Sequence, residues 1–173
     1  MQPFQREAKW ITADPQGIMV GNKTGSHTTA PYMRREFSVS KPVFDATLYV
    51  SGLGYYECYI NGKSVKDTVL DPAFTEYDKA VMYRTHKVTN IVQGNNAISV
   101  VLGDGFYNAD TDDVWNFVNA AWRDHSKCIL ILSIKYEDGT REEIVSDQSF
   151  KGTKGPILAN DVRSLDRYDA RLE

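Results

Sequence analysis

Hydrophobic and polar residues alternate along much of this chain with the period of two that is typical of β-strands. Residues 98–102 place Ile98, Val100 and Leu102 on one face, and every second residue from Cys128 to Tyr136 is apolar. In both segments the opposite face is mixed, as in one layer of a β-sandwich. No segment longer than about ten residues shows the helical period, and a typical globular helix needs that length.

The alternation and the turn residues between segments predict eight strands. They cover residues 32–39, 45–51, 55–61, 63–70, 80–89, 95–103, 128–137 and 141–146. Trp10–Ile11 is predicted to be a short extended anchor and residues 18–30 a loop, and residues 88–92 can form one helical turn. The many short strands predict an all-β fold, an antiparallel β-sandwich of the jelly-roll type. We divide the chain into an N-terminal arm and loop at 1–31 and a sandwich domain at 32–173.

Two dipeptides predict tight hairpin turns. Asn61-Gly62 follows a segment rich in aromatic and β-branched residues, and this pair allows positive φ at both central positions of a type I′ turn. Asp138-Gly139 predicts a second tight turn between the last two strands. Both turns join strands that are adjacent in sequence, which favours an antiparallel arrangement.

Composition narrows the choice of class further. The 173 residues suffice for one domain, and 42% hydrophobic residues suffice for its core. A net charge of -3 argues against a nucleic-acid partner, and no apolar run approaches the roughly 20 residues that a membrane helix needs. The first ten residues lack a basic segment followed by an apolar one, so no secretory signal is expected there.

Cys58 and Cys128 lie in apolar strand patterns and are interpreted as buried free thiols, with a disulfide left open as the alternative.

The connection from residue 104 to residue 127 has no clear strand and carries many aromatic side chains. Loops of this length in a compact domain are usually functional or carry structure of their own. Trp and Tyr rings stack on the apolar faces of sugars while amides, carboxylates and guanidinium groups bind hydroxyls, and Trp115, Asn116, Trp122, Arg123 and Asp124 supply both. The alternative, which we favour, is that these rings cap one open end of the sandwich or dock onto a neighbouring domain.

Other chemistry fits the residues less well. Asp110, Asp112 and Asp113 are too close together to flank a sugar bond as a catalytic pair. Read from Asn108, they begin like an EF-hand, but Asp113 stands where that loop requires Gly and Asn119 where it requires Glu, so only a less regular calcium site stays open. The three histidines, His27, His86 and His125, are too widely spaced to predict zinc.

Motifs spread over nearly the whole chain resemble one family, the N-terminal β-sandwich domain of bacterial α-L-rhamnosidases, a group of glycoside hydrolases. They are WITA at 10–13, LYVSGLGYYE at 48–57, INGK at 60–63, DPAFTEYD at 71–78, LGDGFYN at 102–108, YEDGT at 136–140, SDQSFK at 146–151, GPIL at 155–158 and YDARLE at 168–173. The resemblance implies a sandwich like that of galactose-binding domains. The last motif is similar to the family's junction toward later domains.

In that family the catalytic acids lie on a separate, larger helical barrel. The resemblance therefore implies that this chain alone is not an enzyme. It would be an accessory domain that supports the barrel of a parent α-L-rhamnosidase in hydrolysing terminal α-L-rhamnosides. Its partners would be the catalytic and other domains of the parent chain, and a periplasmic or extracellular parent is consistent with such a role. The rival hypothesis is a carbohydrate-binding module that recognises rhamnose or related sugars, since some relatives hold L-rhamnose through a calcium ion.

Two sets of candidate residues follow from these hypotheses. The surface for carbohydrate or interdomain contact comprises Phe106, Tyr107, Trp115, Asn116, Phe117, Trp122 and Arg123. The positions to examine first for calcium are the polar loop residues Asp104, Asn108, Asn160 and Asp161. No catalytic residue is assigned.

Overall fold

The computed structural model describes residues 4, 7–14, 17–20, 29–66, 68–109, 114–164 and 166–173, and it is built almost entirely of antiparallel strands. One sheet has the order β2-β1-β9-β4-β7, and β10 also pairs with β9. Its strands are β1 (Ile11–Asp14), β2 (Gly17–Val20), β4 (Val43–Leu53), β7 (Arg84–Lys87), β9 (Lys127–Tyr136) and β10 (Arg141–Val145). Two of them, β4 and β9, pair over almost their whole length and form the centre of this layer.

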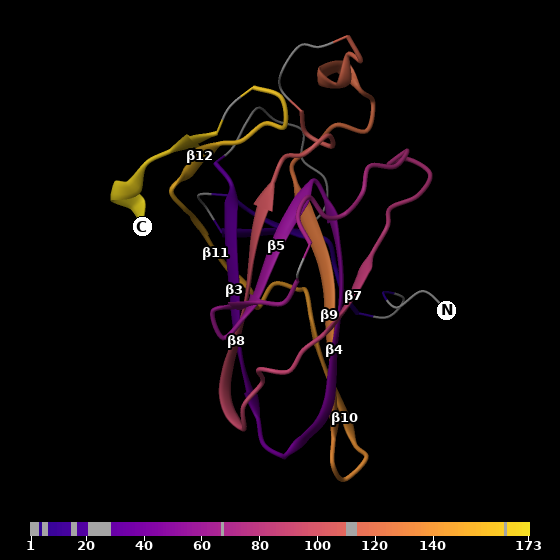
Figure 1. Cartoon of the computed structure of the whole chain (residues 1–173), viewed down its shortest axis with the longest axis vertical. Coiled ribbons are helices and arrows are strands. Elements are labelled where there is room, and N and C mark those ends of the chain that lie inside the picture. The colour runs from indigo at the N-terminus through magenta and orange to yellow at the C-terminus, as the bar shows by residue number, and fades with distance from the viewer. Residues whose placement is uncertain are drawn as a thin grey trace.

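The second sheet has the order β11-β3-β8-β5-β6, and a separate pair, β12-β13, lies near the C-terminus. The strands of the second sheet are β3 (Pro31–Val39), β5 (Tyr55–Ile60), β6 (Lys63–Ser64), β8 (Gly94–Gly103) and β11 (Lys151–Lys154). The remaining elements are β12 (Ile157–Ala159), β13 (Arg167–Tyr168) and the short 3-10 helices η1 (Phe117–Asn119) and η2 (Ala170–Leu172). Figure 1 shows the loop with η1 at one end of the molecule and the β9–β10 hairpin at the other.

The core lies between the two sheets, where the apolar faces predicted from the alternation meet. Val100 and Leu102 of β8 are buried in one layer, and Leu130 and Leu132 of β9 are buried in the other. Each fully buried aliphatic side chain contributes roughly 1.5–3 kcal/mol to folding. These contacts confirm the all-β sandwich.

The hairpin between β5 and β6 confirms the predicted turn. Asn61 has φ 50° and Gly62 has φ 77°, the two positive angles of a type I′ turn. The Asn61 side chain also donates to the carbonyl of Asn90 at 2.9 Å and accepts from the amide of Ala97 at 2.9 Å. Asn61 therefore ties the turn to the neighbouring strand as well as permitting it.

Three predictions for the segment after this turn were wrong. The strand predicted at 63–70 ends at Ser64, the one predicted at 80–89 covers only 84–87, and residues 88–92 form no helical turn. Side-chain bonds hold the irregular chain instead. Asp71, which is buried, accepts from Thr68 and from Arg84 Nε at 3.0 Å. Burial alone would raise the pKa of Asp71, but these hydrogen bonds outweigh burial and lower it.

The loop predicted at 18–30 was wrong in part, because residues 17–20 form β2 and pair with β1. Residues 21–28, which include His27, lie outside the described residues. The extended anchor at Trp10–Ile11 is confirmed in that Ile11 begins β1 and pairs with Cys128. No helix among the described residues is long and apolar enough to cross a membrane.

Both cysteines are buried and unpaired, as the sequence indicated. Cys58 and Cys128 have no exposed surface. Burial raises the pKa of the Cys58 thiol to about 12 and also raises that of Cys128. Both side chains therefore act as small apolar groups in the core.

Candidate functional site

Six aromatic side chains meet at the end of the sandwich that carries η1. We call this group the aromatic end cluster; it consists of Phe74, Tyr77, Phe106, Tyr107, Phe117 and Trp122. Phe74 is its centre, with ring centroids 5.5 Å from Tyr77, 5.5 Å from Phe117 and 5.7 Å from Phe106. Separations of this size are typical of favourable aromatic pairs.

Local backbone geometry brings these rings together. After β8 the chain turns at Gly105, whose φ is 54°, and the Tyr55 ring packs so close that a Cβ on Gly105 would lie 3.2 Å from it. Before η1, Asn116 adopts φ 55°, and its side chain accepts from Asn119 Nδ2 at 2.7 Å. Gly adopts positive φ most readily of all residues, and Asn adopts it more readily than most.

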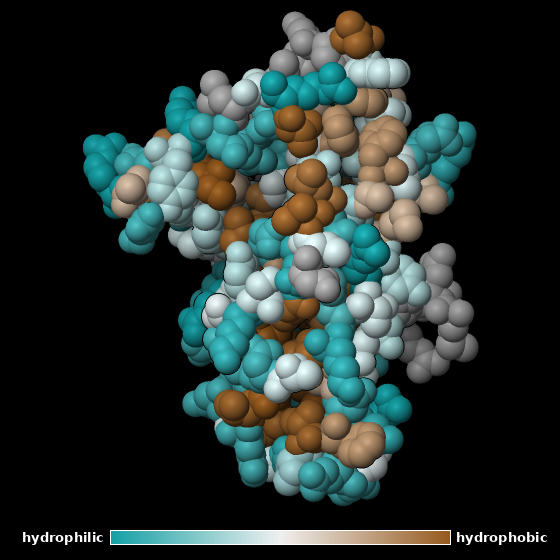
Figure 2. Space-filling model, in the orientation of Figure 1, coloured by the Kyte–Doolittle hydropathy of each residue, from teal (hydrophilic) through white to brown (hydrophobic). Residues whose placement is uncertain are grey.

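The members of the cluster range from buried to exposed. Tyr107 is 6% exposed, whereas Phe74 is 44% exposed and the nearby Trp115 is 64% exposed. Burial raises the pKa of both Tyr107 and Tyr77 to about 12, so both phenols stay neutral at physiological pH. Figure 2 shows tan and brown surface gathered over this end, on the side of the segment that leads to β7.

Four of the seven residues predicted for a contact surface belong to the cluster: Phe106, Tyr107, Phe117 and Trp122. The other three lie in the same loop, with Trp115 and Asn116 exposed and Arg123 half-buried. Whether any of them contacts a sugar or another domain stays a prediction.

Phe74 and Tyr77 were not predicted as site residues. They come from the irregular segment before β7, 29 to 48 residues away in sequence from the rest of the cluster. Their one signal was the motif DPAFTEYD, which carried part of the family resemblance but no indication of a spatial partner.

A buried polar network lies at the same end of the sandwich. Asp104 Oδ1 accepts from Asn108 Nδ2 at 2.8 Å and from Ser126 Oγ at 2.7 Å, and the Asp104 amide donates to Asn160 Oδ1 at 2.7 Å. Three of the four calcium candidates are therefore in contact. Asp161 is engaged elsewhere, because it accepts from the amides of Arg163 and Ser164 in its own turn.

Within the part of the chain that the structure describes, Asn108 Oδ1 and Trp122 Nε1 at this end are buried polar atoms with no hydrogen-bond partner. Unsatisfied buried polar atoms are rare and are found at functional sites. The described residues contain no group of three or more His, Cys, Asp or Glu side chains that could hold a metal. The acidic run at 110–113 lies outside the described residues.

A buried ion pair lies near Tyr107 of the cluster. Lys127 Nζ lies 2.7 Å from Asp124 Oδ2, and the two side chains are 4% and 9% exposed. Burial raises the pKa of Tyr107, and the charge of Asp124 raises it further, which places this carboxylate near the cluster. The pair fixes the point where the long loop enters β9.

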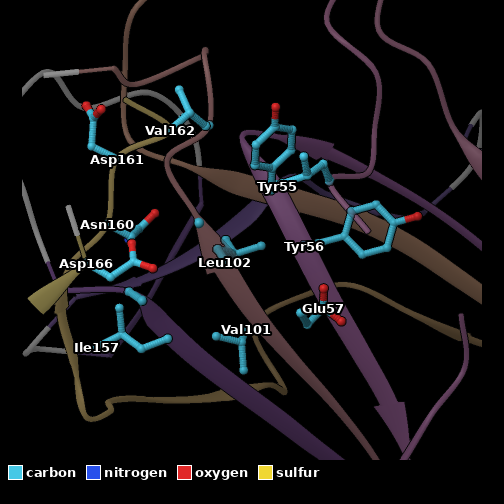
Figure 3. Close-up of a pocket in the computed structure, with 14 residues that line it drawn as sticks. Tyr55, Tyr56, Glu57, Val101, Leu102, Ile157, Asn160, Asp161, Val162 and Asp166 are labelled. Carbon is cyan, nitrogen blue, oxygen red and sulfur yellow. The ribbon is translucent and has the colours of Figure 1, made fainter. Parts of the chain in front are cut away.

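A hollow of about 290 Å³ lies beside the cluster, over the outer side of β5 and β8. Figure 3 shows Ile157, Asn160 and Asp166 of the C-terminal segment facing Val101 and Leu102 across this hollow. Its lining includes the carboxylates of Glu57, Asp161 and Asp166 and the amide of Asn160, which can form hydrogen bonds to a ligand.

Two antiparallel sheets, with the aromatic end cluster at one end and the hollow beside it, define a β-sandwich module. The chain belongs to the family of α-L-rhamnosidase N-terminal domains, and the family model matches residues 41–173. This result confirms the resemblance read from the motifs.

Individual relatives agree with the family. An α-L-rhamnosidase of Formosa agariphila is 39% identical over 149 residues, which are 83% of this chain and 15% of that protein. The structure of the Aspergillus terreus α-L-rhamnosidase matches the whole chain with a TM-score of 0.88 and 31% identity, over 20% of its own length. The structure of the Dictyoglumus thermophilum α-L-rhamnosidase matches with a TM-score of 0.82 and 38% identity, over 19% of its length. The chain thus spans about a fifth or less of these relatives.

Proposed function

We propose that this chain is the non-catalytic N-terminal accessory domain of a longer α-L-rhamnosidase-type glycoside hydrolase. Its role is to support the catalytic barrel that hydrolyses terminal α-L-rhamnosides, and the aromatic end cluster contacts another domain of the parent chain. The observation that carries the proposal is the exposure of Phe74, the central ring of this cluster, which is 44% exposed. A contiguous exposed apolar patch marks an interaction site far more often than a scattered apolar residue does.

The carboxylates near the cluster support a non-catalytic role. Glycoside hydrolysis requires two carboxyl groups that face each other across a sugar bond, about 5–10 Å apart. Asp104 and Asp124 are both buried, and each is engaged by neighbouring donors. Neither is free to protonate a leaving group or to attack a sugar.

Docking is tested by comparing the 173-residue chain with the full protein encoded by its reading frame. Trp115→Ser replaces an exposed aromatic residue two positions before Phe117 of the cluster. We expect it to lower the melting temperature of the full protein by several degrees more than that of the short chain. Phe44→Ser is the matched control, because Phe44 is also exposed but lies at the start of β4, at the end of the sandwich with the β9–β10 hairpin. Equal shifts in both proteins for Trp115→Ser would exclude docking at the cluster.

A second candidate function is a carbohydrate-binding module that uses the same end of the sandwich, with calcium. The observation in its favour is Asn108 Oδ1, a buried acceptor without a donor beside the carboxylate of Asp104. Calcium takes six to eight oxygen ligands, including carboxylate and amide oxygens. Titration of the chain with L-rhamnose, with calcium and then with chelator, tests this function; binding heat that chelator abolishes supports it, and no heat in either condition removes it.

A further inference from the structure

The outer face of β8 forms the floor of a groove between two neighbouring strands. The outward side chains of β8 are small: Ala97, Ser99, Val101 and Gly103. By register, Tyr32 of β3 and Glu57 of β5 flank Val101 on either side. In the same way Arg34 and Tyr59 flank Ser99. Because side chains of the floor are shorter than those of the walls, this face is hollowed along the strand.

Three adjoining hollows follow this floor. The hollow of about 290 Å³ beside Gly103 and a second of about 340 Å³ both contain Val101 in their lining. The second and a third of about 550 Å³ share Arg34 and Ser99. Together they run from Gly103 to Ala97, which is about 20 Å along an extended strand. We call this continuous feature the β8 groove.

Tyrosine rings along the walls are held in place by the backbone. A Cβ on Gly155 would lie 2.1 Å from the Tyr32 ring, and one on Gly105 would lie 3.2 Å from the Tyr55 ring, so each ring packs directly against a glycine. Burial raises the pKa of both tyrosines, which keeps the phenols neutral and able to donate hydrogen bonds. Rigid aromatic side chains lose little conformational entropy when a ligand binds.

The charges of the groove are of both signs, and several of them lie in ion pairs. Arg34 pairs with Glu36 at 2.9 Å, and the buried ammonium of Lys66 lies 2.9 Å from Glu57. Asn61 and Asn95 line the far hollow, and Asn160 lines the near one. Such a lining offers donors and acceptors for hydroxyl groups, and the carboxylates of Glu57, Asp161 and Asp166 in the near hollow disfavour a polyanion.

We propose that the β8 groove binds a linear neutral oligosaccharide along its length. Tyrosine rings supply surfaces for the apolar faces of sugar rings, and amide, guanidinium and carboxylate groups bind the hydroxyls. The groove is long enough for several sugar units, so affinity rises with chain length. This site is separate from the aromatic end cluster and does not depend on the role proposed for that cluster.

The test uses the 173-residue chain and linear neutral tetrasaccharides of rhamnose, glucose, galactose, mannose and xylose, each compared with its monosaccharide. We expect at least one tetrasaccharide to bind at least tenfold more tightly than its monosaccharide. Amide shifts in the NMR spectrum are expected to centre on residues 97–103 and on the flanking segments 32–36 and 55–59. Failure of all five tetrasaccharides to bind, or shifts centred on the 104–127 loop, would overturn the proposal.

Two variants locate the site. Ser99→Trp fills the floor at a half-exposed strand position that tolerates aromatic residues, and we expect it to weaken tetrasaccharide binding at least tenfold. Phe44→Ser, at an exposed position in β4 of the other sheet, is the control and should change binding less than twofold. Binding by Ser99→Trp equal to that of the wild type would contradict the proposal. If Ser99→Trp does not fold, Arg34→Ala in the same groove takes its place. We expect Arg34→Ala to weaken tetrasaccharide binding at least threefold. Unchanged affinity would contradict binding in the groove.

Discussion

At the scale of single residues, the β5–β6 hairpin depends on backbone angles that few side chains tolerate. Asn61 and Gly62 both have positive φ, and nothing lies within 4 Å of the position that a Cβ on Gly62 would occupy. Substitution at Gly62 therefore creates no clash with other residues. Its cost comes from the backbone conformation alone, which makes this position a clean test of the turn.

Gly62→Val is expected to destabilise the protein by about 1–2 kcal/mol, because a β-branched residue at positive φ is strained. For a protein of this size that corresponds to a melting temperature lower by roughly 2–8 °C. Gly62→Asn is the matched control and should lose much less, since Asn tolerates the left-handed region. An unchanged melting temperature for Gly62→Val would show that the turn assignment is wrong.

The two buried thiols lead to a second prediction at this scale. Burial raises the pKa of Cys58 from 9.0 to about 12 and raises that of Cys128 as well, so neither forms a thiolate at pH 8 in the folded protein. A thiol reagent such as DTNB should therefore modify neither cysteine before unfolding and both in denaturant. Ser164→Cys, at an exposed position, should add one promptly reacting thiol. Prompt reaction of the wild-type chain would contradict the burial of these residues.

The sign of the pH dependence follows from the same shift. The folded-state pKa of Cys58 lies above its unfolded value, so the protonated thiol contributes stability in full below about pH 9. That contribution is lost as the pH rises from about 9 toward 12. Raising the pH from about 9 toward 12 should therefore lower the free energy of unfolding, while the thiols stay buried in the folded protein.

At the scale of elements, the long connection between β8 and β9 is fixed by a buried ion pair. Asp124 and Lys127 are spaced i,i+3 with 2.7 Å between Oδ2 and Nζ. A buried pair adds little net stability over an apolar pair, but removing one partner leaves a charge that water cannot solvate. The contribution of this ion pair to stability is therefore measured by removing one of its two partners.

Asp124→Asn is expected to lower the free energy of unfolding by about 3–5 kcal/mol, because it removes the carboxylate from a buried ammonium. Glu76→Gln is a matched control: Glu76 and Lys79 have the same i,i+3 spacing and the same 2.7 Å distance but are exposed. Such a surface pair contributes about 0–1 kcal/mol. Chemical denaturation of both variants measures the difference, and equal losses would show that the burial of Asp124 has no energetic consequence.

The elements also differ in how far the sequence predicts them. The strands β4, β8 and β9 were predicted because an apolar face packed on the core leaves a period of two. The strand β11 was not, because Lys151–Lys154 carries no apolar side chain and pairs at the edge through its backbone. The irregular segment before β7 misled prediction since its order comes from side-chain bonds such as Asp71–Arg84 rather than from alternation.

The candidate site was also predicted only in part from the sequence. Phe106, Tyr107, Phe117 and Trp122 were predicted because they gather in one long loop. Phe74, at the centre of the cluster, was not, because only the packing of the folded chain brings it to them. The β8 groove was also missed, since small residues on a strand carry no local sign that their neighbours are long.

At the scale of the whole molecule, two antiparallel sheets enclose one core and leave the aromatic end cluster at one end and the β8 groove on one face. Membership in the α-L-rhamnosidase N-terminal domain family agrees with this arrangement. The chain makes up 15–20% of the relatives compared, which leaves room for a separate catalytic domain in those proteins. The division into an arm at 1–31 and a sandwich at 32–173 stays a prediction, although β1 and β2 of the arm join a sheet.

The most direct test of the account is turnover of an aryl α-L-rhamnoside by the purified 173-residue chain beside the full protein of its reading frame. We expect release of the aryl alcohol by the full protein and none above background by the chain alone, at any concentration tested. Turnover by the chain alone that disappears in Asp112→Asn or Asp113→Asn would contradict the account, because the bond-breaking acids would then lie in this sandwich.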